Sequence, residues 1–123
     1  MTGKPFKIPD SNHPIVVAPF AGRVVIRCGD KVVADSREAL TLKEANYPAV
    51  MYVPRADADM TLLTRSTHAT HCPYKGDASY FDLPSGANGR NGVWSYETPH
   101  DAVAAIAGHL AFYPDKVEIE TSP

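Results

Sequence analysis

The sequence is poor in cysteine, in excess charge of either sign and in long apolar runs, and each shortage removes a class of protein. Two cysteines, Cys28 and Cys72, stand among 123 residues, and neither belongs to a C-x-x-C pair. A disulfide-rich scaffold and a zinc site built on such pairs are therefore not expected. The formal net charge is −2, so composition favours no basic surface, and nucleic acid is not a predicted partner.

Apolar stretches of the length needed in membranes or export signals are also missing. The longest ones, IVVAPFAG and AVAAIAGHLAF, are too short or too polar to cross a bilayer, so no membrane partner is predicted. The segment MTGKPFKIPDSNHP lacks the apolar core that a secretory signal needs. These features predict a cytoplasmic protein with reduced cysteines. They indicate neither a cofactor nor an oligomeric state.

Proline is abundant, and the β-branched runs are short. Eleven prolines in a chain of this length argue against a helical bundle. We expect one short helix near 101–107, ended by Gly108, and a helical turn within 56–63. Seven or eight strands are expected among the segments 23–28, 31–35, 39–44, 49–53, 67–72, 78–83, 93–97, 109–113 and 116–120.

This pattern predicts a mainly β fold. Short strands separated by frequent turn signals are typical of a single compact domain of two packed antiparallel sheets or a partly open barrel. The hairpin over 23–35 has the best local support, because Gly29 suits the first central position of a two-residue turn. We divide the chain into an extended arm at 1–14, one β domain at 15–120 and a short tail at 121–123.

The segment THATHCPYKGDASYF, residues 67–81, gathers the most chemistry. Alternation along a strand places His68 and Cys72 on one face and His71 on the other, unless the strand bends or ends there. Pro73 favours such an end, because it cannot donate to a β ladder. On that basis we predict that His71, Cys72 and Lys75 converge on one pocket.

Three chemistries fit this segment. Cys72 could act as a nucleophile with a nearby imidazole and ammonium to favour its thiolate, which makes Cys72, His71 and Lys75 the candidate catalytic residues. Lys75 with turn amides could hold an anion. His68, His71 and Cys72 supply at most three metal ligands, so no metal residue is assigned. The structural alternative is a folding device, in which Pro73 fixes the turn and aromatic side chains fill the core.

Further residues are candidates for ligand contacts. The set combines charged groups near the turn with aromatic walls and a guanidinium at a strand end: His68, Tyr74, Asp77, Arg55, Trp94 and Tyr96. The aromatic members could equally be core residues, and Arg55 an exposed one.

Three carboxylates are candidates for metal binding or for acid–base catalysis. Asp57 and Asp59 could share a face of a strand and hold Mg²⁺, or begin a short helical turn, which we favour. Glu44 lies in a polar KEAN turn and could serve as a general acid or base only if it is buried.

Several stretches resemble a known family. VVADSREALTLKEANYPAVMYVPRADADMTLL, STHATHCPYKGDASYF, VWSYE and IAGHLAFYPDKVEI resemble the bacterial family catalogued as domain of unknown function 427, over roughly residues 15–120. The resemblance implies a mainly β domain with a topology similar to the β-tent class. The C-x-x-C pairs with which many β-tent proteins bind zinc are missing here. A nucleotidyltransferase label attached to the family implies a Gly-Ser with following carboxylates, whereas this chain has the reversed Ser85-Gly86.

We therefore expect a small-molecule-binding domain, with an enzyme at the HCPYKGD turn as one version of it. Two alternatives remain at this point. One is a non-catalytic structural or interaction domain, and the other is a metal-dependent enzyme of the nucleotidyltransferase type.

Overall fold

Ten short strands form the fold of the described part of the chain. The structure is a computed structural model and describes residues 4–123, so the first three residues of the predicted arm lie outside the described residues. The strands are β1 (Ile15–Pro19), β2 (Arg23–Cys28), β3 (Lys31–Ser36), β4 (Leu40–Glu44), β5 (Val50–Tyr52), β6 (Thr64–Cys72), β7 (Gly76–Asp82), β8 (Val93–Ser95), β9 (Ala111–Phe112) and β10 (Glu118–Ser122).

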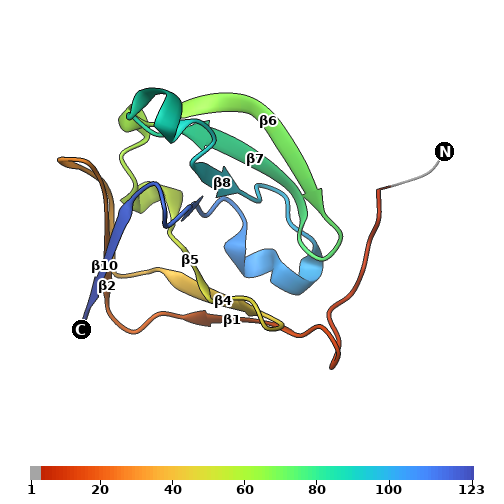
Figure 1. The fold of residues 1–123 in the computed structure, drawn as a ribbon. Helices are drawn as coiled ribbons and strands as arrows, with labels where there is room; N and C mark the ends of the chain where they lie inside the picture. The colour runs from red at the N-terminus through yellow and green to blue at the C-terminus, as the bar shows by residue number, and fades with distance from the viewer. Residues whose placement is uncertain (1–3) are drawn as a thin grey trace.

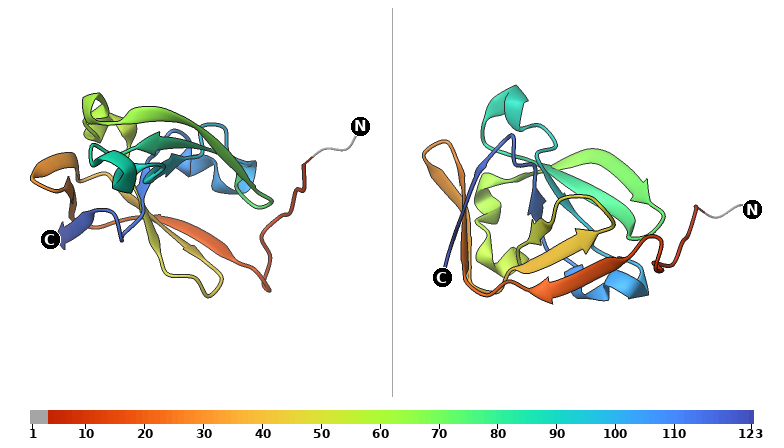
Figure 2. Two further views of the ribbon diagram at one scale, coloured as in Figure 1. Left: turned by 45° about the horizontal axis from the view of Figure 1, so that its top comes forward. Right: turned by 60° about the horizontal axis from the view of Figure 1, so that its bottom comes forward.

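The strands form three antiparallel sheets. Their orders are β1-β4-β5, β10-β2-β3 and β6-β7-β8-β9. Figure 1 shows the sheet of β6, β7 and β8 lying over the sheet of β1 and β4, with β2 and β10 along one side, and Figure 2 shows the same arrangement from two other directions. A pair of 2.8 Å backbone hydrogen bonds between Val53 and Leu110 joins the first sheet to the third. The mainly β prediction is confirmed, and the described strands do not close into a barrel.

Within residues 4–123, helical structure is limited to four short 3₁₀ segments. They are η1 (Arg55–Asp57), η2 (Met60–Leu62), η3 (Gly86–Gly89) and η4 (Asp101–Ile106). η4 lies where the helix near 101–107 was expected, and it buries Val103 and Ile106. Within the described residues, no helix is long and apolar enough to cross a membrane.

The β6-β7-β8-β9 sheet supplies side chains to two apolar cores. Alternate residues of a strand point to opposite faces, so Phe81 and Val93 pack with residues of β2 and β3 in one core. Tyr80 and Ala111 pack with Leu42 and with η4 in the other. This second core, between the β6-β7-β8-β9 sheet and the β1-β4-β5 sheet, borders the candidate site.

The local predictions match the strands closely. The expected hairpin is β2 and β3, joined by Gly29 and Asp30, and Gly29 has the positive φ of +63° that such a turn requires. β1 was not expected as a strand, although it pairs with β4 over its whole length. Its apolar run ends in Pro19, which gives little strand signal.

The arm before β1 lies against the turn between β6 and β7. The amide of Lys7 donates to the carbonyl of Pro73 at 2.9 Å, and the amide of Ala45 donates to that of Pro14 at 2.8 Å. The arm is therefore held to the rest of the molecule at both ends of its described part, and Figure 1 shows it running beside the β6–β7 turn.

Candidate functional site

The tight turn between β6 and β7 aims Lys75 inward. Cys72 and Gly76 are the last paired residues of the two strands, so Pro73, Tyr74 and Lys75 make the whole connection. Gly76 has φ +111°, a conformation that favours glycine. As a result, the Lys75 ammonium contacts the carboxylate of Glu44, which lies at the end of β4 in the facing sheet.

Lys75 and Glu44 form a largely buried ion pair. Lys75 Nζ donates to Glu44 Oε1, and the two side chains are 12% and 13% exposed. The second carboxylate oxygen accepts from His13 Nε2 at 2.7 Å. Burial opposes ionisation of Glu44, but the hydrogen bonds from Lys75 and His13 outweigh it and hold the pKa of the carboxyl below its ordinary value. Glu44 is therefore ionised at neutral pH.

Aromatic side chains line a hollow beside this ion pair. The hollow has a volume of about 220 Å³, and we call it the tyrosine pocket. Its aromatic lining residues are Tyr47, Tyr52, Tyr80, Trp94, Tyr96 and Tyr113, and its other lining residues are Leu42, Glu44, Pro48, Val50 and Lys75.

The strand pattern explains why these rings meet. Tyr80 and Trp94 are direct cross-strand partners on β7 and β8, and Tyr96 follows Trp94 by two positions on the same face. Tyr52 comes from β5 and accepts a hydrogen bond from Trp94 Nε1 at 3.2 Å. Tyr113 packs on Trp94, with ring centroids 4.6 Å apart. Two facing sheets therefore build the pocket.

The tyrosine hydroxyls with raised pKa values in the pocket stay protonated at neutral pH. Burial raises the pKa of Tyr52 to about 12 and raises that of Tyr96 further. Burial and the neighbouring Tyr80 raise the pKa of Tyr113 to about 12. These hydroxyls can donate or accept hydrogen bonds, but they add no charge.

An apolar groove adjoins the tyrosine pocket. It has a volume of about 410 Å³ and shares Tyr47, Pro48, Val50 and Trp94 with the pocket. Its other lining residues are Ile26, Ala49, Met51, Phe112, Pro114 and Ile119. The groove offers apolar contact next to the polar end of the pocket.

Of the three predicted catalytic residues, Lys75 alone lines the tyrosine pocket, which corrects the prediction that the three converge, and His71 has other partners. Its Nδ1 is 2.7 Å from Asp77 Oδ1 and its Nε2 is 2.6 Å from the carbonyl oxygen of Pro5. The reason is strand alternation: β6 stays paired through Cys72, so Pro73 does not turn His71 toward the pocket. His13, from the arm, supplies the imidazole next to Lys75 instead.

Cys72 lies near the pocket without lining it. It packs against the second core, and its thiol is close enough to Tyr52 and Tyr96 to influence their ionisation. His68 shares the Cys72 face of β6, as alternation predicts, and its ring lies 4.5 Å from the ring of Tyr80. His68 is solvent-exposed.

The predicted ligand-contact residues divide into two groups. Trp94 and Tyr96 line the tyrosine pocket. Tyr74 stacks on His13, with ring centroids 4.0 Å apart. Asp77 instead pairs with His71 and with Lys4. These last contacts hold the arm and do not face the pocket.

Arg55 binds a carboxylate of the chain itself. It donates to Glu97 at 3.1 Å, and Arg65 donates to both oxygens of the same carboxylate, at 2.8 and 3.1 Å. The guanidinium fork expected at this strand end is therefore occupied within the protein.

The two aspartates considered for Mg²⁺ have helical roles. Asp57 ends η1 and accepts from Ser36 Oγ at 2.6 Å. Asp59 caps η2 by accepting from the amide of Thr61 at 3.1 Å. Across residues 4–123 we find no group of three or more His, Cys, Asp and Glu side chains that could hold a metal ion.

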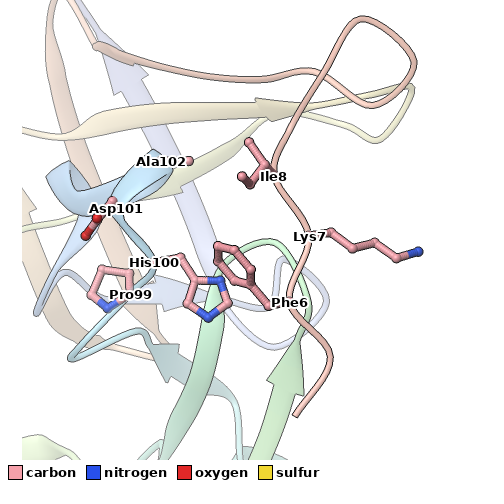
Figure 3. Close-up of a pocket in the computed structure, with 7 residues that line it drawn as sticks. All are labelled: Phe6, Lys7, Ile8, Pro99, His100, Asp101 and Ala102. Atoms are coloured by element: carbon pink, nitrogen blue, oxygen red, sulfur yellow. The ribbon is translucent and has the colours of Figure 1, made fainter. Parts of the chain in front are cut away.

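A second hollow lies beneath the arm. Its volume is about 430 Å³, and Figure 3 shows Phe6 and Ile8 of the arm facing His100 and Ala102 across it, while Lys7 points away. Phe6 and Ile8 are 62% and 68% exposed, so this hollow is a shallow, solvent-facing feature. It contains no ion pair comparable to that of Lys75.

The site also uses residues that the sequence did not assign to it. Glu44 was considered only on condition of burial, and the structure meets that condition. The strand positions of Tyr52 and Tyr80 are as typical of core residues as of pocket residues. His13 gave no signal, because 31 positions separate it from Glu44 and only the tertiary fold joins them.

Comparison with known proteins gives a family. The family model described as domain of unknown function (DUF427) matches residues 16–123, which is most of the chain. The match includes β2 to β10, all of β1 except Ile15, η4 and every residue of the tyrosine pocket. No curated protein matches the chain.

Proposed function

Because the chain belongs to the DUF427 family, which is defined by its domain and not by an activity, we propose a function from the site: the tyrosine pocket binds a small organic molecule. The observation that carries this proposal is the ion pair of Lys75 and Glu44 at the end of an aromatic hollow. Ligand sites typically combine apolar walls with a few placed polar groups.

The ion pair supports a binding role through its cost. Removing two charges from water is expensive, and an apolar pair of similar volume often stabilises a fold equally well or better. A gain in folding stability is therefore a weak explanation for the presence of Lys75 and Glu44 at this position. Recognition of a ligand is a stronger one, because both side chains line the hollow.

The structural alternative uses the same contacts differently. Glu44 bonds both Lys75 of the turn and His13 of the arm, so the pair could serve only to fasten these segments together. A ligand that binds reversibly in the pocket distinguishes the two functions, because a fastening role predicts none.

A catalytic function has less support in the structure than a binding function. Of the three predicted catalytic residues, Lys75 reaches the pocket, whereas both ring nitrogens of His71 are held by Asp77 and Pro5. An enzyme at this site would use Lys75 and Glu44, with Cys72 at its border.

Binding can be tested by NMR with 2-naphthamide, a neutral bicyclic carboxamide. Trp94 is the one tryptophan of the sequence, so its indole N–H gives a single signal from the pocket wall. We expect this signal to shift saturably, with a dissociation constant on the order of 1 mM or tighter for a ligand of this size.

A matched pair of variants locates the binding. Val50→Phe places a larger side chain in the pocket and should weaken binding about tenfold, a change of about 1.4 kcal/mol. Val32→Phe makes the same change at an exposed position of β3 and should leave binding unchanged. The proposal is contradicted by shifts confined to the hollow beneath the arm, or by no saturable shift with 2-naphthamide or with its anionic and cationic analogues, 2-naphthoate and 2-naphthylmethylammonium.

A further inference from the structure

We infer that the tyrosine pocket selects an uncharged aromatic molecule bearing a polar group over the corresponding anion or cation. The inference rests on the proposed function and names its ligand class. Its basis is the distribution of charge around the pocket. Each charge that lines the pocket is already matched by an opposite charge.

The lining of the pocket holds one positive and one negative group. These are Lys75 and Glu44, and they are bonded to each other. The remaining lining residues are apolar or are tyrosines, and the raised pKa values of Tyr52, Tyr96 and Tyr113 keep those hydroxyls neutral. The adjoining groove is lined by uncharged side chains throughout.

The titratable groups just outside the pocket add no unscreened charge that could attract a charged ligand. His13 donates to the second oxygen of Glu44 from outside the lining. On the solvent side, Lys43 bonds the carbonyls of Ala45 and Tyr47, and Asp115 lies near enough to Tyr113 to raise its pKa. Both Lys43 and Asp115 are exposed, so water screens them.

A charged ligand would find no free counter-charge. A carboxylate would compete with Glu44 for Lys75 and then lie beside a second carboxylate. An ammonium group would compete with Lys75 for Glu44 and lie beside a second cation. Either ion would also lose its water on entry, and an unpaired buried charge is costly.

A neutral polar group avoids this competition. An ammonium has three N–H donors, and Lys75 Nζ gives one of them to Glu44. A carbonyl oxygen can accept another without breaking the ion pair. An amide N–H can donate to a tyrosine hydroxyl, and the aromatic body packs against Trp94 and Tyr113.

Three probes of nearly equal shape test the inference at pH 7.5. They are 2-naphthamide, 2-naphthoate and 2-naphthylmethylammonium, which are neutral, anionic and cationic. NMR titration of the Trp94 indole signal gives the three dissociation constants. We expect the neutral probe to bind about tenfold more tightly than either ion, or about 1.4 kcal/mol.

Two variants should change this order in opposite directions. Glu44→Gln leaves Lys75 without its carboxylate, so the anion should gain at least about tenfold relative to the neutral probe. Lys75→Met leaves Glu44 without its ammonium, so the cation should gain by a similar factor. The controls Glu38→Gln and Lys31→Met change exposed residues outside the pocket and should keep the wild-type order.

The outcomes separate the inference from the proposed function. Failure of all three probes to bind the wild-type protein overturns the proposed function and the inference with it. Binding of either ion as tightly as the amide overturns the inference alone, and the wild-type titrations decide this even if a variant does not fold. Variants that fold and keep the wild-type order also overturn it.

Discussion

Single carboxylates of this chain sit in three different electrostatic settings. Glu44 is largely buried between Lys75 and His13. Glu97 is half-buried between two guanidinium groups, and Asp77 bonds His71 and Lys4 of the arm. The first setting lines the pocket, and the other two stabilise the fold around it.

Glu97 should make the protein lose stability in acid. Hydrogen bonds from Arg65 lower the pKa of Glu97 to about 2, with further contributions from Arg55 and Ser79. A lowered pKa stabilises the folded state above the ordinary pKa of a glutamate, and this stability is lost as pH falls toward 2. After allowing for solvent screening, we expect the Glu97→Gln variant to be less stable at pH 7 by about 1–2 kcal/mol.

Denaturant unfolding at several pH values measures this effect. The difference in unfolding free energy between the wild type and Glu97→Gln should shrink as pH falls from 5 to 2. Glu38→Gln is the matched control at an exposed position. A difference that stays constant over this range would show that Glu97 is not held ionised by the two arginines.

At the scale of elements, the arm and the β6–β7 turn behave as one unit. Lys7 bonds the backbone of Pro73, and His13 stacks on Tyr74. His71 fastens the same arm from the other face of β6 through the carbonyl of Pro5. The turn that positions Lys75 therefore depends on the arm for part of its support.

Docking of the arm should weaken as pH rises. The Pro5 carbonyl and then the Asp77 carboxylate raise the pKa of His71, against smaller opposing effects of desolvation and of Lys4. A protonated imidazole can donate from both nitrogens, as these two acceptors require. A raised pKa stabilises docking below the ordinary histidine pKa of about 6.5, and the gain is lost as pH rises through the raised value.

Hydrogen exchange at the Lys7 amide reports this docking, because that amide donates to Pro73. Its protection factor should fall with rising pH in the wild type and become nearly independent of pH in His71→Ala. His109→Ala, whose ring bonds the backbone of Ala107, serves as the control. Equal pH dependence in the wild type and His71→Ala would refute a role for His71.

For the whole molecule, the sequence predicted what local signals determine. The hairpin of β2 and β3 follows from its turn, and the predicted site residues Lys75, Trp94 and Tyr96 line the tyrosine pocket. Alternation also predicted the shared face of His68 and Cys72.

The contacts that complete the site come from distant parts of the chain. Val53 and Leu110 join β5 to β9, and no local sequence pattern predicts this pairing. The approach of His13 to Glu44 has the same long-range character. The expectation for His71 failed because it assumed that the strand would bend or end at His71, whereas β6 stays paired through His71 and Cys72 and ends only before Pro73. Long-range pairing determined these outcomes, and the local pattern did not.

A crystal structure of the protein soaked with 2-naphthamide would test the proposed binding site most directly. We predict electron density for the bicyclic ring in the tyrosine pocket against Trp94, with the amide oxygen within hydrogen-bond distance of Lys75 Nζ. Density only in the hollow beneath the arm, or an empty pocket at a concentration that saturates the Trp94 indole shift, would contradict it.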